Sequence, residues 1–575
     1  MKIFKLLILS VILSSCGDDK KEFEYAGGSL SMCLENAPFT YVSFESEDFN
    51  SQEVLRQVVE GLVSFDPISN RIVQQIAKEW TLNNNGLTYT FTLRDDVYFH
   101  PHELLTNNDL QLTAKDVIAT FEKICSKNPE GKETEAYGYI FKGSLKGSDA
   151  YHLKKAKSIS GLKATKTGIE VTLLEKDDNF LAKLASVQAS ILPKKLLDEN
   201  RLNDLVGTGP FRYIANENTY PNKINLIKNS TYYQVSSEGF RLPFLDEIHF
   251  IVENKKLNQL ALFENKEIDM ILGLPTSSIT KMLEGRIEDF NAKPPKLVLS
   301  TNPVLVSHYY FFNMNDPRFN DVRVRQAFNY AINKDKIGAD ILRNQYNELG
   351  NYGLVPPIAK DFRGYDFKSV KNAGYKYNPE MAKSLLAQAG FPDGKDFGSV
   401  TLRFNIGDIN SAVAEEFANQ INQVLGINVN IDGSSFSQLN EDASLGKGAI
   451  FRTAWSADYP NPETFLNQFY GKHLIGPEGK TSSVNQAKYS NPSFDYLFEK
   501  AKKEDNIKEK MLLYTKSEIE LLKNPPFIPL WYDGEMQIIY SNVRNLVFNS
   551  LGLFNFKQVY KKEWSKEEYQ NSIKK

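Results

Sequence analysis

The sequence predicts an α/β protein with at least two lobes, and three observations support this prediction. Short β-rich runs alternate with helices that have clear start and stop signals. A helix expected over 412–425 ends at Gly426 and is followed by the alternating strand 427–432, which is typical of a βαβ layer. The chain has 575 residues, which is more than a single hydrophobic core usually supports. Hydrophobic residues make up 41% of the chain, which is enough to build more than one core.

The chain begins with an expected export signal. Lys2 and Lys5 precede an apolar run of about ten residues, too short to cross about 30 Å of hydrocarbon as a helix. The end of this run, Leu13-Ser14-Ser15-Cys16, is similar to the lipobox of bacterial lipoproteins, so we expect residues 1–15 to be removed and Cys16 to be lipidated. An ordinary secretory peptide with a chance cysteine is the alternative. Residues 16–26 are charged and then Gly-rich, and we expect a flexible tether there.

Charge and cysteine content exclude several classes of protein. The formal net charge is −3 with both signs interspersed, so neither nucleic acid nor an acidic membrane surface is expected as the main partner. Apart from Cys16, only Cys33 and Cys125 are present, which is too few for a disulfide scaffold. We expect two free buried thiols, with a single disulfide as the alternative. Beyond the signal, no run approaches 18 uninterrupted apolar residues, so no other membrane span is expected.

Three further elements are defined by local signals. Residues 87–93 alternate with period two and predict a half-buried strand. Thr113 and Asp116 form a capping box that opens a helix, whose inner face is Val117, Phe121, Ile124 and Cys125. The segment 378–390 begins with a capping Asn and a first-turn Pro and ends in a Gly, which predicts a helix with both ends defined.

Motifs for metal, cofactor and hydrolytic chemistry give no convincing match. His100 and His102 share a strand face and, with Glu103, have a spacing that can hold a metal, but the adjacent Pro101 favours a structural strand end. A phosphate-binding loop, a dinucleotide fingerprint, G-x-S-x-G and H-E-x-x-H are all absent. We therefore expect no metal, no cofactor and no enzymatic activity.

A series of short motifs follows the chain in a fixed order. They are Glu60-Gly61-Leu62, Ala77 to Trp80, Thr90 to His100, Thr113 to Val117, Val206 to Tyr213, Arg241 to Phe250, Glu264 to Asp269, Phe311 to Asn333 and Ala457 to Leu466. In both content and order this series resembles the extracytoplasmic solute-binding proteins of peptide-type ABC importers. The resemblance covers about residues 27 to 560, and it is specific for the family but only weakly specific for the ligand.

The resemblance implies a two-lobed α/β periplasmic-binding-protein fold that closes on its ligand about a hinge, with an extra subdomain inserted in the first lobe. The boundaries expected by analogy are 27–302 with 530–575 for the first lobe, about 64–189 for the insert, and 303–529 for the second lobe. The chain should cross between the lobes near Asn302 and near Pro529, where a Pro-rich stretch is expected to form a stiff connection.

The stretch FRTAWSADYPNPETF, residues 451–465, holds the main candidate site residues. The resemblance implies that Asp458 pairs with the α-ammonium of a peptide ligand, and that Arg452 lies where some members receive its C-terminal carboxylate. Alternation along a strand would place both side chains on one face. The alternatives are a turn-forming role for Asp458 and a surface or interlobe salt bridge for Arg452.

Five more residues are candidates for the wall of the cleft: Glu47, Phe49, Trp455, Tyr459 and Tyr532. Glu47 and Phe49 align with an edge segment that faces the ligand in family members. For Trp455 and Tyr459, packing in the core is the alternative, and for Tyr532 it is packing at the hinge.

The resemblance implies a lipid-anchored, monomeric receptor of the bacterial cell envelope that delivers short peptides to the membrane subunits of an ABC permease. Strand addition to the peptide main chain, with charged groups at both ends, would give recognition that does not depend on side chains. Nickel chelates, oligosaccharides or a peptide signal are alternative ligands for the same scaffold. From other classes, a hydrolase with a similar cleft and an envelope sensor or chaperone remain as alternatives.

Overall fold

The computed structural model describes residues 21–128, 131–214, 222–274, 279–474 and 484–573. The expected signal and Cys16 lie outside these ranges, so the prediction of lipidation is not addressed by the structure. Within the described residues, no helix combines the length and the apolar character needed to cross a membrane.

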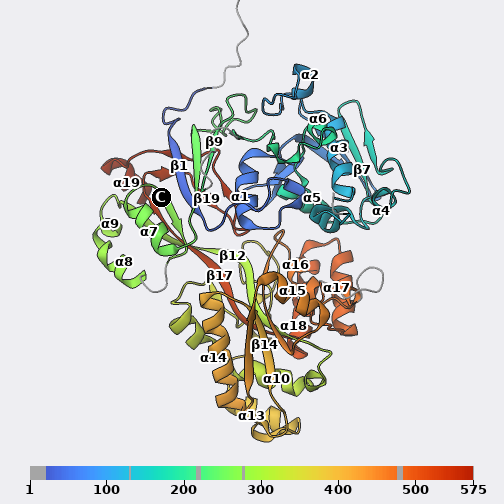
Figure 1. Cartoon of the computed structure of the whole chain (residues 1–575), viewed down its shortest axis with the longest axis vertical. Helices are drawn as coiled ribbons and strands as arrows, with labels where there is room; N and C mark the ends of the chain where they lie inside the picture. The colour runs from blue at the N-terminus through green and yellow to red at the C-terminus, as the bar shows by residue number, and fades with distance from the viewer. Residues whose placement is uncertain (1–20, 129–130, 215–221, 275–278, 475–483, 574–575) are drawn as a thin grey trace, which may run out of the picture.

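Two long antiparallel strands connect an upper and a lower lobe (Figure 1). They are β12 (Leu297–Phe312) and β17 (Phe527–Tyr540), and they pair along nearly their whole length, with a register irregularity between Pro303 and Ser307. Both belong to an eleven-stranded sheet of the described residues, in the order β15-β14-β16-β12-β17-β11-β1-β10-β9-β8, with β13 (Glu348–Leu349) also paired to β17. The strands on either side of this central pair build the two lobes.

The first lobe, the upper body in Figure 1, contains β1 running parallel to both β10 and β11. Alternate residues of β1 are buried, as expected for a strand with one face on the core. The main elements of this lobe are β1 (Ser29–Leu34), α1 (Phe49–Val58), β8 (Phe211–Tyr213), β9 (Lys223–Lys228), β10 (Glu247–Val252), α7 (Lys256–Glu264), β11 (Met270–Leu272), α8 (Ile279–Gly285), α9 (Ile287–Asn291) and α19 (Lys566–Ile573).

An additional four-stranded antiparallel sheet, β4-β5-β7-β6, forms the inserted part of the first lobe. Its core is continuous with that of the lobe. The main elements are β2 (Val63–Phe65), β3 (Ile72–Gln74), β4 (Ala77–Leu82), β5 (Thr88–Leu93), α2 (Asn107–Leu110), α3 (Ala114–Cys125), α4 (Ser148–His152), β6 (Leu162–Ala164), β7 (Gly168–Thr172), α5 (Phe180–Leu184) and α6 (Lys194–Asp198).

The structure confirms the local predictions for the insert. β5 alternates between buried and partly buried residues, and α3 begins with a complete capping box between Thr113 and Asp116. All four residues expected on the inner face of α3 are buried.

The second lobe contains the predicted βαβ unit, in which β14 and β15 are parallel and α14 connects them. α14 begins four residues before the expected start and ends at Gly426, whose φ of +68° is left-handed. The main elements are α10 (Val322–Ala331), α12 (Phe367–Ala373), α13 (Pro379–Gln388), β14 (Val400–Asn405), α14 (Asp408–Leu425), β15 (Val429–Ser434), α15 (Phe436–Leu445), β16 (Ile450–Ser456), α16 (Pro462–Leu466), α17 (Pro492–Lys503) and α18 (Ile507–Lys523).

The hydrophobic cores follow the same division. The largest cluster takes its members from residues 30–270 and 539–559, while two others take theirs from 305–531. Pro529, expected at a crossing between the lobes, instead lies inside β17 opposite Tyr309. The change from the cores of the second lobe to the core of the first lobe occurs on the C-terminal side of Pro529 in β17, near the register irregularity of the central strand pair.

Two glycines of the 206–213 motif fix the position of α1. An added Cβ at Gly207 would lie 2.1 Å from the carbonyl oxygen of Val58, and one at Gly209 would lie 2.6 Å from the same atom. Real Cβ atoms do not approach a carbonyl oxygen this closely, so the backbone here requires glycine. The motif therefore allows a loop to pack directly on the last turn of α1.

The expected tether is shorter than the sequence suggested. Residues 21–26 are already packed on the first lobe, where Phe23 stacks on Phe244 with ring centroids 4.3 Å apart and meets Tyr560 edge-on. The aromatic side chain outweighs the charged and Gly-rich composition around it, because stacking on buried rings removes its apolar surface from water.

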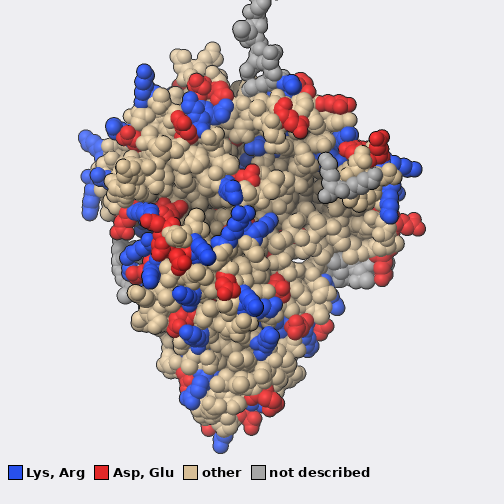
Figure 2. All heavy atoms as spheres, turned by 180° about the vertical axis from the view of Figure 1, so that it is seen from behind, with Lys and Arg blue, Asp and Glu red and all other residues tan. Residues whose placement is uncertain are grey.

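The distribution of charged side chains on the surface and the state of the two described cysteines agree with the expectations from the sequence. Basic and acidic side chains are interspersed over the face seen in Figure 2. Both Cys33 and Cys125 are free, with Cys125 fully buried and Cys33 partly so.

Candidate functional site

A cavity of about 340 Å³ lies where the first lobe faces the end of β16. The first lobe lines it with α1 and the loop before it, residues 185–190 and residues 549–557. The second lobe contributes Ser456, Ala457 and Asp458, and the insert contributes Tyr139 together with most of 185–190 and residues between 64 and 75. The lining combines carboxylates, amides, hydroxyls and two cations with apolar side chains such as Phe49, Leu551 and Phe554, and this mixture is typical of a ligand site.

Asp458 combines solvent contact with protein surroundings. The residue is exposed because it faces the cavity, yet protein atoms surround its carboxyl on the other sides. This burial raises the pKa of Asp458 to about 6, and Lys183 of the insert partly opposes the shift. A carboxylate whose charge is poorly solvated gains more from a cationic ligand than a fully hydrated one does.

Tyr139 lies on the short helix η2 (Tyr137–Phe141) and supplies a second polar group near Asp458. Its hydroxyl is buried and has no hydrogen-bond partner among the described residues. Burial, followed by the charges of Asp458, Asp177 and Glu463, raises the pKa of Tyr139 well above its usual value, so the hydroxyl keeps its proton. An unpaired buried hydroxyl is costly, and a ligand atom can supply the missing partner.

Glu47 and Phe49, the candidates that the family resemblance implied for an edge segment, also line the cavity. Glu47 lies next to Glu135 of the insert. Burial and then Glu47 raise the pKa of Glu135 to about 8, so Glu135 is mostly protonated at neutral pH. This part of the wall therefore carries less negative charge than the sequence indicates.

Arg452 does not belong to the cavity lining. Its guanidinium donates to Asn405 Oδ1 at 2.9 Å and contacts His308 Nδ1 at 2.9 Å. His308 in turn bonds Asp533 at 2.8 Å and stacks on Trp531 with ring centroids 4.2 Å apart. The strand face expected to align Arg452 with Asp458 does not continue that far, because β16 ends at Ser456.

The three aromatic candidates are likewise absent from the lining of this cavity. Trp455 is half-buried, and its Nε1 donates to Thr464 Oγ1 at 3.1 Å. Tyr459 and Tyr532 are buried, and the Tyr532 hydroxyl donates to the Gly353 carbonyl at 2.8 Å. Their contacts correspond to the core and hinge packing that the sequence left as alternatives.

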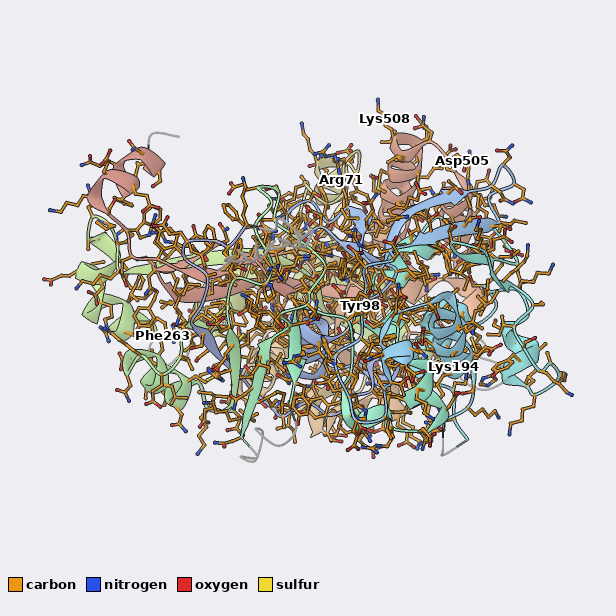
Figure 3. The ribbon with its side chains drawn as sticks, turned by 90° about the horizontal axis from the view of Figure 1, so that it is seen from above. Arg71, Tyr98, Lys194, Phe263, Asp505 and Lys508 are labelled. Atoms are coloured by element: carbon orange, nitrogen blue, oxygen red, sulfur yellow. The ribbon has the colours of Figure 1, made fainter. Side chains whose placement is uncertain are left out.

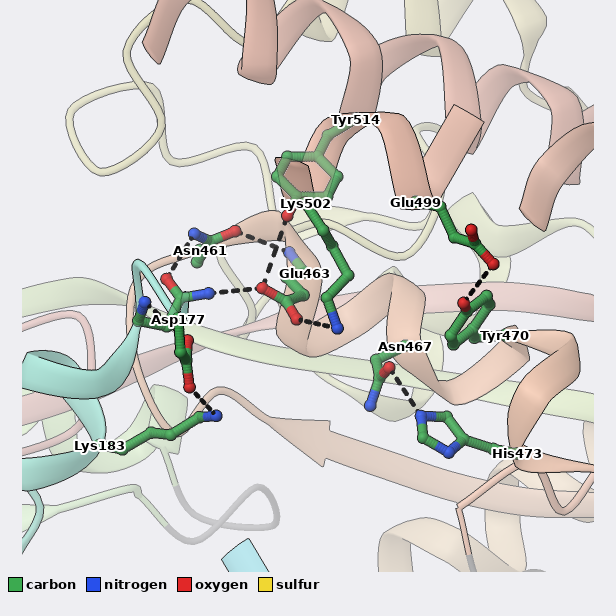
Figure 4. A network of polar contacts seen from close by, with 11 residues as sticks. Asp177, Lys183, Asn461, Glu463, Asn467, Tyr470, His473, Glu499, Lys502 and Tyr514 are labelled. Atoms are coloured by element: carbon green, nitrogen blue, oxygen red, sulfur yellow. Dashed lines mark hydrogen bonds and ion pairs between the residues drawn. The ribbon is translucent and has the colours of Figure 1, made fainter. Parts of the chain in front are cut away.

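The insert also contacts the second lobe directly beside Asp458. Asn179 accepts a hydrogen bond from Asn461 at 3.0 Å and donates to Glu463, which is also bound by Lys502 at 3.1 Å (Figure 4). Asp178 pairs with Lys510 of α18. We call Asp178, Asn179, Asn461, Glu463 and Lys510 the interlobe latch.

The interlobe latch is extended by an exposed ion pair and connected to the cavity. Lys176 pairs with Asp505, which lies just before α18. This ion pair lies toward the side of the molecule opposite to α7. Seen from above, Asp505 and Lys508 are on one side and Phe263 of α7 is on the other (Figure 3). Lys183, whose charge opposes the rise in the pKa of Asp458, pairs with Asp177 at 2.7 Å in the same segment of the insert.

Removing the latch side chains of the insert should weaken ligand binding. Exposed ion pairs contribute about 0.2–1 kcal/mol and hydrogen bonds to charged groups about 1.5–3 kcal/mol. We expect the double variant Asp178→Ala, Asn179→Ala to lose about tenfold in ligand affinity by calorimetry, about 1.4 kcal/mol. Small-angle X-ray scattering should show a larger radius of gyration for the double variant than for the wild type.

The control for the latch is Lys163→Ala. It removes an exposed ion pair with Glu170 that lies entirely within the insert. Equal affinities for the wild type and the double latch variant would show that these contacts do not contribute to closure.

The family of the chain follows from a comparison with known protein families. A model described as "Bacterial extracellular solute-binding proteins, family 5 Middle" matches residues 71–475, well over half of the chain.

The chain belongs to this family.

Curated relatives cover nearly the whole family 5 chain. The oligopeptide-binding protein OppA of Bacillus subtilis is 22% identical over 574 residues, covering 96% of this chain and 98% of the relative. Heme-binding protein A of Haemophilus influenzae is 25% identical over 534 residues, covering 90% of each. The names of these relatives show that related proteins bind different solutes.

A solved structure shows the same fold. The periplasmic binding protein DppA from Helicobacter pylori, in complex with the peptide STSA, matches with a TM-score of 0.74 at 24% identity. The match covers 94% of this chain and 99% of that one. The two-lobed α/β fold predicted from the sequence is therefore confirmed, and the chain is an extracytoplasmic binding protein of a family whose function is solute binding rather than catalysis.

The histidines of this family 5 protein have structural roles in the described residues. His100 is buried, its Nε2 lies 2.9 Å from the Gly209 carbonyl oxygen, and burial lowers the pKa of His100 to about 4. His102 pairs with Asp204 instead of approaching His100 as a second ligand. No group of His, Cys, Asp and Glu side chains in the described part of the chain could hold a metal ion.

Proposed function

We propose that this chain is the solute-binding subunit of an ABC importer, and that it captures short peptides through their free amino terminus. The observation that carries the proposal is the position of Asp458, an incompletely solvated carboxylate at the mouth of an interlobe cavity. Support also comes from the relatives and from the solved neighbour, several of which are named for peptide binding.

The proposed binding step pairs groups from two parts of the molecule. Asp458 of the second lobe receives the ammonium, and Tyr139 of the insert gives or accepts a hydrogen bond at the same end of the ligand. Closure brings these groups around the ligand and excludes water, which strengthens each polar contact. A ligand without an amine leaves Asp458 enclosed and unpaired, which costs free energy.

Calorimetry with Ala-Ala-Ala, its N-acetyl form and hemin tests this function. We expect Ala-Ala-Ala to bind, the acetylated form to bind at least tenfold more weakly, and hemin not to compete. Hemin is the appropriate counter-ligand because one relative is named for heme binding. Tight binding of hemin without binding of any peptide would contradict the proposal.

Peptide affinity should depend on pH through Asp458. The pKa of this carboxyl is raised to about 6 in the protein without ligand, and an ammonium partner favours the ionised form. Affinity should therefore be constant between about pH 6 and 7 and fall below about pH 6, approaching tenfold per pH unit, while loss of the proton from the peptide amine lowers it again near pH 8. Titrations between pH 5 and 7 measure the dependence on Asp458, and it should disappear in Asp458→Asn.

The proposed location is the outer face of a bacterial membrane, with lipidated Cys16 as the anchor and the permease subunits as partners. The described chain is packed from Phe23 onward, so only a few residues would separate such an anchor from the first lobe. The mass of the mature protein purified from membranes checks the cleavage and the lipid.

A further inference from the structure

One cation in the cavity has two nitrogens without a hydrogen-bond partner in the part of the chain that the structure describes. Arg56 lies in the last turn of α1 and lines the cavity. Its Nε donates to the Gln52 carbonyl at 3.1 Å and lies 3.4 Å from Glu53 Oε2. Within the described residues, its two terminal nitrogens have no hydrogen-bond partner. The side chain is 14% exposed, so what remains accessible faces the cavity.

The neighbouring carboxyl does not cancel the charge of Arg56. Glu53 is completely buried, and burial raises its pKa to about 8 even though Arg56 opposes the shift. Its Oε2 lies 3.4 Å from Arg56 Nε, so this carboxyl does not occupy the two terminal nitrogens of the guanidinium. The guanidinium remains positive, desolvated and open on one side, and such a group gains strongly from an anionic partner that accepts two parallel hydrogen bonds.

The second cation of the cavity is already balanced. Burial lowers the pKa of Lys557, and the charges of Glu60 and Asp66 oppose this shift, while its Nζ donates to Gln234 Oε1 at 2.8 Å. Glu60 is itself held by hydrogen bonds from Tyr232 and Thr208. Lys557 thus belongs to a buried polar cluster of the first lobe, whereas Arg56 is the lining cation with free donors.

Arg56 and Asp458 line the cavity from different lobes. Asp458 belongs to the second lobe and Arg56 to the first, so a solute that bridges them would contact both lobes at once. Such a solute must carry an amine toward Asp458 and an acid toward Arg56.

We propose that Arg56 receives a carboxylate of the bound solute, so that this cavity selects ligands that carry a free acid in addition to a free amine. This inference rests on the proposed function and adds a specificity-determining residue to it. The carboxylate can come from the C-terminus of a short peptide or from an acidic side chain, and both offer the same two-oxygen acceptor.

Calorimetry with matched acid and amide peptides tests the inference. The first pair is Ala-Ala-Ala and its C-terminal amide, and the second is Ala-Glu-Ala-amide and Ala-Gln-Ala-amide. The wild type should bind one acid at least tenfold more tightly than its amide partner, and the pair that discriminates identifies the source of the carboxylate. Arg56→Gln should bind both members of that pair equally, and Arg56→Lys should keep part of the difference.

Two variants serve as comparisons. Arg323→Gln removes an arginine that pairs with Asp321 at the start of α10, and it should keep the full discrimination. Loss of discrimination in Lys557→Gln, with retention in Arg56→Gln, would assign the acid to Lys557 and overturn the inference. No discrimination by the wild type for either pair would also overturn it.

The design separates this inference from the proposed function. Peptides that bind in an amine-dependent way without acid preference contradict only the role of Arg56, whereas no peptide binding at all contradicts the function itself. Since Arg56→Gln leaves Glu53 without its partner, the double variant Glu53→Gln, Arg56→Gln provides a neutral pair. The difference between free and acetylated peptides in that variant reports that the cavity is intact.

Discussion

Replacing Asp458 by Asn should weaken binding of Ala-Ala-Ala by at least tenfold, or about 1.4 kcal/mol, without lowering the unfolding temperature. The substitution keeps the shape of the side chain and removes the charge that would pair with the ammonium. Acetylated Ala-Ala-Ala should bind the variant at least as tightly as it binds the wild type, because the substitution removes the carboxylate that this ligand leaves unpaired. Calorimetry on these four combinations gives the coupling between Asp458 and the amine.

The stability part of this prediction follows from the pKa. The pKa of Asp458 is raised from 3.8 to about 6, so folding favours the protonated form. Its contribution to stability is therefore fully present below about pH 4 and is lost as the pH rises through about 6. At pH 7 the ionised side chain is a net cost in the absence of ligand, and Asn removes that cost. Unchanged peptide affinity in Asp458→Asn would exclude this residue from the site, with Glu441→Gln as the control for an exposed acid.

Gly207→Ala should destabilise the protein by about 3 kcal/mol or more, because the new methyl group would lie 2.1 Å from the Val58 carbonyl oxygen. The neighbouring atoms are backbone and cannot rotate away, so either α1 or the glycine loop must move. The midpoint of urea unfolding should shift accordingly. Since α1 carries part of the cavity wall, peptide affinity should fall as well.

The control for this prediction is Gly285→Ala. Gly285 is the last residue of α8, and an added Cβ there meets no atom within 4 Å. This substitution should change the unfolding free energy by less than about 1 kcal/mol. Equal stabilities of the two alanine variants would mean that the contact between Gly207 and α1 does not constrain the fold.

Elements with local signals were predictable from the sequence. The capping box before α3, the defined ends of α13 and the left-handed Gly426 all depend on residues within one or two turns. The two long central strands were not predicted. β12 contains Pro303 at a register irregularity, and β17 contains Pro529. In the sequence alone, a proline indicates the end of a strand, because it cannot donate a hydrogen bond to a neighbouring strand.

The candidate site was predictable only where the family resemblance supplied it. Asp458, Glu47 and Phe49 line the cavity, whereas Tyr139 and Arg56 were missed. Neither of the missed residues has a distinctive neighbourhood in the sequence. The cavity is assembled from segments far apart in the chain, so a tyrosine on a short helix or an arginine on an amphipathic one gives no local sign that it faces a ligand.

The paired connection between the lobes limits how the molecule can open. β12 and β17 are bonded to each other through most of their length, so neither can bend or twist independently of the other. Any opening of the lobes therefore has to bend both strands together. The interlobe latch consists of a few polar contacts that are partly exposed, so breaking them costs little free energy compared with disrupting the strand pair.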